Sequence, residues 1–469
     1  MSATTTGTKL AAWMRSEGNE PRLLRRIFWV GFLVRVLYMT LAHTYHMRLI
    51  LDHFEFGWEM GRIARALVAG YGFANPFNGH SGPTAWCPPL YPLLLAAVFK
   101  LFGVYTLKSG WVILTINSIF SAATAIAIYE IAWRCFGRTA QGLKVALWSA
   151  WLWALYPAAM QYAVKWVWDM ALTAFLFAWV IVLALRIRGV GDSTSSPQPT
   201  TSNRQPTTYW LLFGLLWGLI ALCNSSLLTF LPACGLWIVW PALRGLGAPS
   251  KLRLGGIGRF LAGPILAAFL FIAVISPWVI RNWVVFHAFV PMRSNFGAEL
   301  YEATIFSNDG FPWMATLPLA ESAPEFRRYE RLGEIAYSKQ QGEIAKAKIR
   351  AHPDLFARNA LRRVYFFWIS VPHPTDSGVS VEAIRRINFS FTSFAGLLGL
   401  ALAIRRRIPA AWLFFWAFAI IPFIYYFVTV QARFRHPLEP IICVLSVYLF
   451  QSADRTRTWS WQKTAGDSE

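Results

Sequence analysis

Two glutamates in the segment LDHFEFGWEMGRIARALVAGYGF, Glu55 and Glu59, have the chemistry of a general base. Residues 58–69 show the apolar spacing of a short amphipathic helix, and both acids stand at its start. A carboxylate held there could take the proton of an acceptor hydroxyl or amine. The alternative interpretation is that acids near a helix N-terminus only stabilise the helix dipole. Spacing leaves both interpretations open.

A third carboxylate, Asp169, lies in a short connection between two apolar runs. An acid at the mouth of a helix bundle is costly unless it faces water or a cation. Lys165, four residues earlier, could pair with it on one helix face. The alternative is that Asp169 faces the same cavity as Glu59.

Two further segments carry cations that suit a phosphate group. SPWVIRNWVVFHAFVPMRSNFG contains Arg281 and Arg293, and QARFRHPLEP contains Arg433, Arg435 and His436. A guanidinium binds phosphate oxygens with two parallel hydrogen bonds. The alternative is snorkelling towards lipid headgroups. We interpret the five residues as phosphate ligands, because they cluster on the predicted outer face, where basic residues are normally few.

No motif in the chain requires a cofactor. The sequence has no Walker A loop, no GxGxxG after a strand, no GxSxG and no HExxH. His53, His80 and the nearby glutamates occur in one segment and leave room for a divalent metal, although their spacing matches no standard metal site. We therefore expect chemistry without a bound nucleotide.

The composition indicates the kind of protein that positions these candidate residues. Of 469 residues, 56% are hydrophobic and 14% charged, against about 25% charged in soluble domains. Apolar stretches of about 20 residues, the length that spans a bilayer, recur along the chain. These features exclude a disordered chain and predict an all-α polytopic membrane protein in contact with membrane lipid. The net charge of +21 fits basic cytoplasmic loops better than a nucleic-acid partner.

Charge and length predict about ten transmembrane helices. The expected spans are 27–46, 110–133, 145–160, 169–187, 209–223, 226–243, 260–280, 387–404, 408–429 and 437–452. Pro89–Phe102 is short for a span, and placing it along the outer surface puts the basic loops on one side. Segments 1–26 and 453–469 are then cytoplasmic, and the bundle 27–280 carries the outer loop 47–109 with the candidate acids. A large extracytoplasmic loop, 281–386, precedes the C-terminal helices of 387–452.

Two long connections have distinct compositions. Residues 321–359 have mixed charges and predict helices with a break at Pro353. Residues 189–208 are rich in Ser, Thr and Pro and predict a flexible cytoplasmic linker. On the map of predicted spans, most titratable residues fall on the outer face of the inner (plasma) membrane.

Five stretches resemble bacterial glycosyltransferase family 39, relatives of dolichyl-phosphate-mannose protein mannosyltransferases and of the lipid A aminoarabinose transferase. They are IARALVAGYGF, PPLYPLLLAAVFKLFG, IAWRCFG, PWVIRNWVVFHAFVPMRSNFG and RFRHPLEP, within residues 27–452. The resemblance implies the C-type glycosyltransferase fold, with interfacial helices in the first outer loop. It also implies a sugar donor carried on a polyprenyl phosphate, inversion at the anomeric carbon, and an acid after the first span near the reaction centre.

The sequence departs from the family at that acid. Family members often carry an adjacent Asp-Glu pair, whereas this chain reads Glu55-Phe56-Gly57-Trp58-Glu59. We take Glu59 as the first candidate for the base, then Glu55, then Asp169. The acceptor would be a protein, a lipid or an envelope glycan.

Two other classes of function compete with a transferase. A transporter or flippase of lipid-linked sugars would carry charged residues or broken helices at mid-membrane, where Glu130 and Arg35 are the candidates. A non-catalytic protein of envelope assembly would have no need for an acid facing phosphate-binding arginines.

Overall fold

The computed structural model describes residues 19–137, 139–192, 207–246, 254–308, 310, 323–369, 371 and 379–452. In this part of the chain every regular element is a helix, and the one bridge between extended residues joins Ala74 to Pro83. The predicted all-α class is confirmed. Most of the predicted linker 189–208, most of segment 1–26 and the whole of 453–469 lie outside the described residues.

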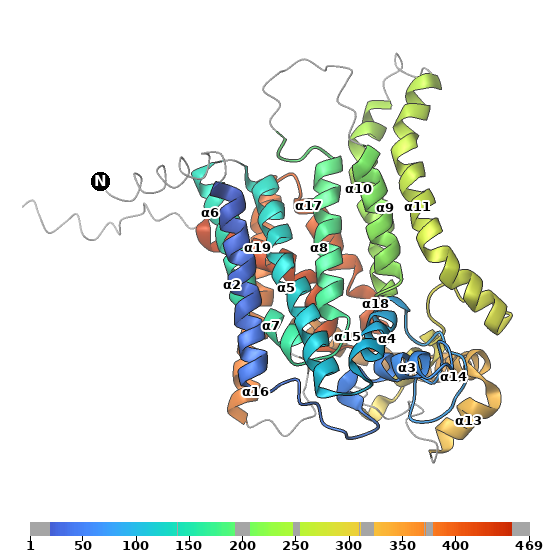
Figure 1. Ribbon diagram of the computed structural model, residues 1–469. Coiled ribbons are helices and arrows are strands. Elements are labelled where there is room, and N and C mark those ends of the chain that lie inside the picture. Colours follow the sequence, from blue (N-terminus) through green and yellow to red (C-terminus); the bar gives the residue numbers. More distant parts are fainter. Residues whose placement is uncertain are drawn as a thin grey trace, which may run out of the picture.

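Long apolar helices form an upright bundle (Figure 1). They are α2 Asn19–Leu41, α5 Leu107–Phe136, α6 Ala140–Leu155, α8 Met170–Ile187, α9 Thr207–Ala221, α10 Leu231–Leu246, α11 Leu254–Phe286, α16 Val379–Arg405, α17 Ala411–Ile420 and α19 Glu439–Gln451. Among the described residues, four helices are long and apolar enough to cross a membrane: α5, α8, Leu261–Phe286 of α11 and Glu382–Arg405 of α16. Four shorter apolar helices accompany them. The chain is a multi-pass membrane protein, and the number of ten spans stays a prediction.

Prolines break two of the apolar runs that we expected to be continuous. The run 145–160 divides into α6 and α7 Pro157–Val164, and the run 408–429 divides into α17 and α18 Phe423–Phe427 after Pro422. Proline has no backbone N–H and clashes with the preceding turn, so it starts a helix more readily than it continues one. The last predicted span likewise begins as the 3₁₀ helix η4 Ala432–Leu438 before α19.

The predicted outer segments fold as helices at one end of the bundle. They are α3 Glu59–Val68, α4 Leu90–Phe102, α12 Phe296–Glu302, α13 Pro324–Leu332, α14 Glu334–Ala351 and α15 Pro353–Trp368. Helices α3, α13 and α14 lie at the end opposite the C-terminus of α8 and the N-terminus of α9 (Figure 1). The predicted helices at 58–69 and 90–102 and the break at Pro353 are confirmed. With 13 residues, α4 is about 20 Å long, which is too short for a span of about 30 Å.

Candidate active site

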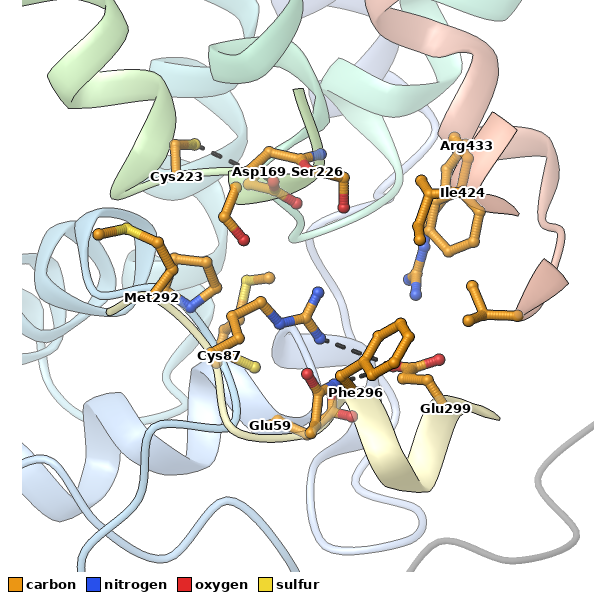
Figure 2. A pocket seen from close by; sticks show the side chains of 18 of the residues that line it. Glu59, Cys87, Asp169, Cys223, Ser226, Met292, Phe296, Glu299, Ile424 and Arg433 are labelled. Carbon is orange, nitrogen blue, oxygen red and sulfur yellow. Dashed lines mark hydrogen bonds and ion pairs between the residues drawn. The ribbon is translucent and has the colours of Figure 1, made fainter. Parts of the chain in front are cut away.

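One cavity of about 400 Å³ lies where the outer helices meet the bundle. Figure 2 shows Glu59, Asp169 and Arg433 entering it from three different elements. The loop before α3, the start of α8, the end of α9, the segment 291–299 and the segment 424–434 all contribute lining residues. The cavity therefore unites segments that are far apart in the sequence.

Glu59 is the first residue of α3 and lines the cavity. Gly57 has φ +94, and a Cβ there would lie 2.7 Å from the carbonyl oxygen of Val167. Only glycine fits that approach, so Gly57 lets the first outer loop pack against the connection that carries Asp169. Burial raises the pKa of Glu59 above its ordinary value, although Arg433, Arg62 and Arg293 act in the opposite direction. A carboxylate with a raised pKa is a stronger base once it has lost its proton.

Asp169 faces the same cavity as Glu59. Its Oδ2 accepts a hydrogen bond from Thr173 Oγ1 at 3.1 Å, and Cys223 Sγ lies 4.0 Å away. Within the described part of the chain, Asp169 forms no ion pair with Lys165, whose ammonium group instead lies 5.9 Å from the Trp166 ring. Of the two arrangements considered from the sequence, Asp169 therefore has the second: it faces the cavity and does not pair with Lys165.

Two of the predicted arginines reach the cavity. The guanidinium of Arg433 stacks on Trp168, with Cζ 4.1 Å from the ring centroid, and it has no carboxylate partner among the described residues. Arg293 donates from Nε to the carbonyl of Trp86 at 3.0 Å, and its Nη2 lies 3.6 Å from Glu299 Oε1. Arg433 is therefore free to bind an anionic group, and Arg293, which lines the same cavity, retains further N–H donors.

Glu55 and Arg281 lie elsewhere, contrary to their grouping in the sequence. Glu55 pairs with Arg48, whose Nε is 2.6 Å from Oε1 and whose backbone N–H is 2.7 Å from Oε2. Arg281 donates to the carbonyls of Thr84 and Phe73, each at 2.7 Å. Neither residue lines the cavity. Arg281 instead holds the backbone of the first outer loop.

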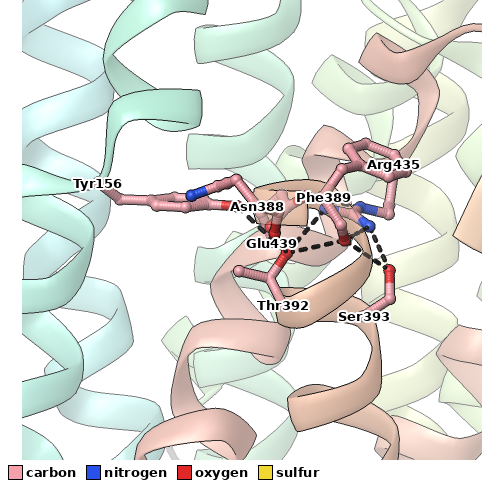
Figure 3. A network of polar contacts seen from close by, with 7 residues as sticks. All are labelled: Tyr156, Asn388, Phe389, Thr392, Ser393, Arg435 and Glu439. Atoms are coloured by element: carbon pink, nitrogen blue, oxygen red, sulfur yellow. Dashed lines mark hydrogen bonds and ion pairs between the residues drawn. The ribbon is translucent and has the colours of Figure 1, made fainter. Parts of the chain in front are cut away.

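Arg435 also departs from its predicted place. Its Nε donates to Glu439 Oε1 at 2.6 Å, and its Nη1 donates to the carbonyl of Phe389 at 2.9 Å (Figure 3). Ser393 and Thr392 accept further hydrogen bonds. The fully buried guanidinium therefore joins η4 and α19 to α16, and four of its five N–H groups donate to acceptors within the fold.

His436 is enclosed between aromatic rings. Its ring centroid lies 4.6 Å from that of Tyr162 and 5.5 Å from that of Trp153, and only 1% of the residue is exposed. It does not line the cavity. Arg435 and His436 thus pack inside the bundle, although they lie only two and three residues after Arg433 in the sequence.

The architecture is similar to that of solved membrane proteins, whereas no protein-family model and no curated protein matches the chain. The apo oligosaccharyltransferase of Archaeoglobus fulgidus aligns at 14% identity and TM-score 0.52, over 93% of this chain and 51% of that one. The same enzyme, AglB, with an inhibitory peptide and a dolichol-phosphate gives 13% identity and TM-score 0.51, over 92% and 50%. This chain has the C-type glycosyltransferase fold.

The match to the oligosaccharyltransferase covers only about half of that protein's length. ArnT from Cupriavidus metallidurans, bound to undecaprenyl phosphate, aligns over 93% of this chain and 78% of its own, at 13% identity and TM-score 0.38. The two alignments to the oligosaccharyltransferase confirm the predicted fold, and at 13% and 14% identity they show the fold alone.

Within the C-type fold, the cavity contains residues that our sequence analysis did not select. Glu299 and Asn295 line it from α12 and its N-cap, and Cys87 and Cys223 line two other parts. Asn295 Nδ2 donates to Glu299 Oε1 at 2.9 Å. No feature of the sequence separates Glu299 from the other acids of the large outer loop, since only the fold brings it to Arg293.

The described residues contain no cluster of side chains that could hold a metal ion. Among them, no group of three or more His, Cys, Asp or Glu side chains is placed to hold an ion. His53 stacks on Tyr105 at 4.0 Å between ring centroids, and the Nδ1 of His80 lies 3.4 Å from Asn75 Nδ2. These two histidines, our candidates for metal ligands, do not line the cavity.

The two residues that would favour a transporter are paired inside the protein. Arg35 donates to Ser121 Oγ at 3.1 Å and to the carbonyl of Ala154 at 2.7 Å. Glu130 pairs with Arg134 at 2.8 Å and with Arg186 at 2.7 Å. Neither lines the cavity. Their partners within the protein therefore explain why Arg35 and Glu130 can lie among apolar helices.

Proposed function

We propose that the protein is a membrane glycosyltransferase, which moves a sugar from a polyprenyl-phosphate donor to an acceptor. One observation carries the proposal: a single cavity holds the carboxylate of Glu59 and the guanidinium of Arg433, which has no carboxylate partner in the described chain. A transferase of this kind needs a base for the acceptor and a cation for the departing phosphate. The acceptor would be a protein, a lipid or an envelope glycan.

Arg433 and Arg293 would bind the donor phosphate. When the bond between the anomeric carbon and the phosphate oxygen breaks, its electron pair stays on the phosphate. A guanidinium aimed at this oxygen stabilises the growing negative charge, and it does so best where water is excluded. The aromatic faces of Trp168 and Phe434 hold Arg433 in place, at 4.1 and 5.3 Å from Cζ.

Glu59 would act as the general base. It would take the proton of the acceptor hydroxyl or amine while the acceptor oxygen or nitrogen bonds to the anomeric carbon. Attack from the face opposite the phosphate inverts that carbon in a single displacement. Asp169, which lines the same cavity, is the second candidate, and the ion pair of Glu55 with Arg48 makes Glu55 the third.

The shared fold supports a lipid-phosphate donor. The archaeal oligosaccharyltransferase was solved with a dolichol-phosphate, and in another structure with a tethered acceptor peptide containing the NVT sequon. From these structures we infer for this chain only the binding of a lipid phosphate, because its own cavity contains the arginine that such a phosphate requires. The apolar bundle beside the cavity provides the surroundings for the lipid tail.

We place the reaction on the outer face of the plasma membrane. The short basic segments lie at the cytoplasmic ends of the predicted spans, and the helices around the cavity lie together at one end of the bundle (Figure 1). An impermeant thiol reagent tests this, because all five native cysteines are buried. In intact spheroplasts, Gln340→Cys, at an exposed position of α14, should be labelled, and Ser196→Cys should not. The reverse pattern would invert the topology.

The proposed transfer can be tested with the purified protein and radiolabelled polyprenyl-phosphate sugars. Label should leave the donor and enter a peptide, lipid or glycan fraction, and Glu59→Gln should abolish this transfer. The proposal would be contradicted if the label stayed on intact donor whether a peptide, a lipid or a glycan was offered as the acceptor.

A further inference from the structure

A buried carboxylate outside the cavity connects the segments that form one of its walls. Glu334, the first residue of α14, is 5% exposed. It accepts hydrogen bonds from the backbone N–H of Ala85, from Ser294 Oγ and from the Tyr329 hydroxyl, each at 2.6 Å. The Thr84 hydroxyl donates a fourth. One side chain therefore binds the first outer loop, the segment after α11, and α13.

Two of these segments continue directly into the cavity wall. Cys87 follows Ala85 by two residues and lines the cavity, and Arg293 precedes Ser294. The segments also bind each other, because the N–H of Ser294 donates to the carbonyl of Ala85 at 3.1 Å. The Nε of Arg293 donates to the carbonyl of Trp86 at 3.0 Å. The position of the Arg293 guanidinium thus depends on the same junction.

We propose that Glu334 is a positioning residue of the active site, which holds the wall formed by Cys87 and Arg293 in the geometry that binds the donor phosphate. The inference rests on the proposed function, and it gives the large outer loop a role in the reaction. Four donors from three segments satisfy the carboxylate oxygens, which a purely apolar contact could not do with the same directionality. A shift of about 1 Å in a substrate-positioning group can cost about a hundredfold in rate.

The donors around Glu334 favour the ionised form of its carboxyl group, whereas burial disfavours it. Burial raises the pKa of its carboxyl group, while the hydrogen bonds from Ser294, Thr84, Tyr329 and Ala85 lower it. An ionised carboxylate accepts all four hydrogen bonds, whereas a glutamine amide nitrogen cannot accept any. Glu334→Gln therefore keeps the size of the side chain and disrupts half of the junction.

The control is Glu325, a carboxylate of the same outer domain. It accepts hydrogen bonds from the Tyr337 hydroxyl at 2.9 Å and from Gln341 Nε2 at 3.1 Å, so it connects α13 only to α14. None of these three residues lines the cavity. Glu325→Gln thus disrupts a carboxylate network between α13 and α14 without touching the wall.

The protein contains its own reporters for the test. Cys87 lies in the wall that Glu334 holds, and Cys223 lines the cavity from the turn that follows α9. Cys135, Cys234 and Cys443 are buried in the bundle and report global unfolding. The experiment measures the alkylation rate of each cysteine by mass spectrometry in the full-length purified protein, using a small neutral reagent and no substrate.

In Glu334→Gln, Cys87 should react about tenfold faster, as expected when a buried charge-assisted hydrogen bond is lost, while the other four cysteines keep the wild-type rate. Glu325→Gln should leave all five rates unchanged. An unchanged rate at Cys87, or an equal rise at all five cysteines, would overturn the inference. Because this measurement needs no substrate, it decides the positioning role even if the proposed transfer is wrong.

A kinetic readout then connects the wall to the reaction. In Glu334→Gln, the KM for the polyprenyl-phosphate sugar should rise about tenfold, while kcat, which depends on Glu59 in α3, stays within about threefold. A fall in kcat at constant KM would contradict a role in placing Arg293.

Discussion

Arg433 and Arg435 are separated by one residue in RFRHPLEP, yet they belong to different regions of the molecule. Arg433 lines the cavity, with aromatic rings on its guanidinium and no ion pair to a carboxylate within the described chain. Arg435 is buried, with a carboxylate, two hydroxyls and a carbonyl as acceptors (Figure 3). The first is open to a ligand, and the second is committed to the fold.

The helix type explains why neighbours differ so much. Both arginines lie in the 3₁₀ helix η4, in which each residue turns the chain by about 120° because there are three residues per turn. Residues two positions apart therefore point in different directions. The comparison shows that a cluster of cations in a sequence is not yet a binding site: the acceptors around each guanidinium decide its role.

The largest effect is expected on the cavity side, at the carboxylate. Glu59→Gln keeps the size of the side chain but cannot take a proton, so the transfer rate should fall by about 10²–10⁴. Glu55→Gln is the matched control, because it is on the same loop but paired with Arg48 away from the cavity. Initial rates with labelled donor measure both. Full activity in Glu59→Gln together with loss in Glu55→Gln would reassign the base.

On the buried side, we expect a loss of stability. Arg435→Ala leaves the carboxylate of Glu439, which is 3% exposed, without its cation. Removing one partner of a buried ion pair costs about 3–5 kcal/mol of unfolding free energy. Thermal unfolding in detergent should therefore show a lower Tm for Arg435→Ala, and the same Tm as wild type for Arg433→Ala.

A second variant separates this loss from a general packing defect. Replacing both partners, Arg435→Met with Glu439→Leu, should restore most of the stability, because no unpaired charge remains. If Arg435→Ala unfolded at the wild-type temperature and lost donor binding, the two arginines would share a ligand role after all.

The smallest effect concerns pH. Glu59 acts as a base only when deprotonated, and burial raises its pKa above the ordinary glutamate value of 4.5. Transfer should therefore be lost as the pH falls through that raised pKa. Arg433 lowers the pKa of Glu59, so Arg433→Ala should move the acidic limb of the pH–rate profile to higher pH. A limb that stayed in place would show that the two groups do not interact.

The sequence was sufficient for the elements whose signal is local. The amphipathic spacing of 58–69 predicted α3, the double proline before Leu90 predicted the start of α4, and Pro353 marked the start of α15. Hydropathy could not show that Pro157 ends an apolar run, because the residues on both sides are equally apolar.

The site was predictable only in part, because it is formed by contacts between distant segments. Glu59, Asp169, Arg293 and Arg433 could be selected by residue type and by their predicted position on the outer face. Glu334 could not, since its partner Ala85 lies 249 residues away. The local sequence also could not predict that Arg433 lines the cavity and Arg435 is buried, because these environments depend on Trp168 and on the side chains of α16.

The central claim is that the cavity binds a lipid phosphate through Arg433, and a binding measurement tests it most directly. Radiolabelled polyprenyl phosphate and the matching polyprenyl alcohol, which lacks the phosphate, would be titrated against the purified wild-type protein and Arg433→Ala. A charge-assisted hydrogen bond is worth about 1.5–3 kcal/mol, so wild type should prefer the phosphate by about tenfold to a hundredfold. Arg433→Ala should lose that preference, and Arg433→Lys should regain part of it, because an ammonium group lacks the bidentate geometry. Equal binding of phosphate and alcohol by the wild type, or an undiminished preference in Arg433→Ala, would contradict the account.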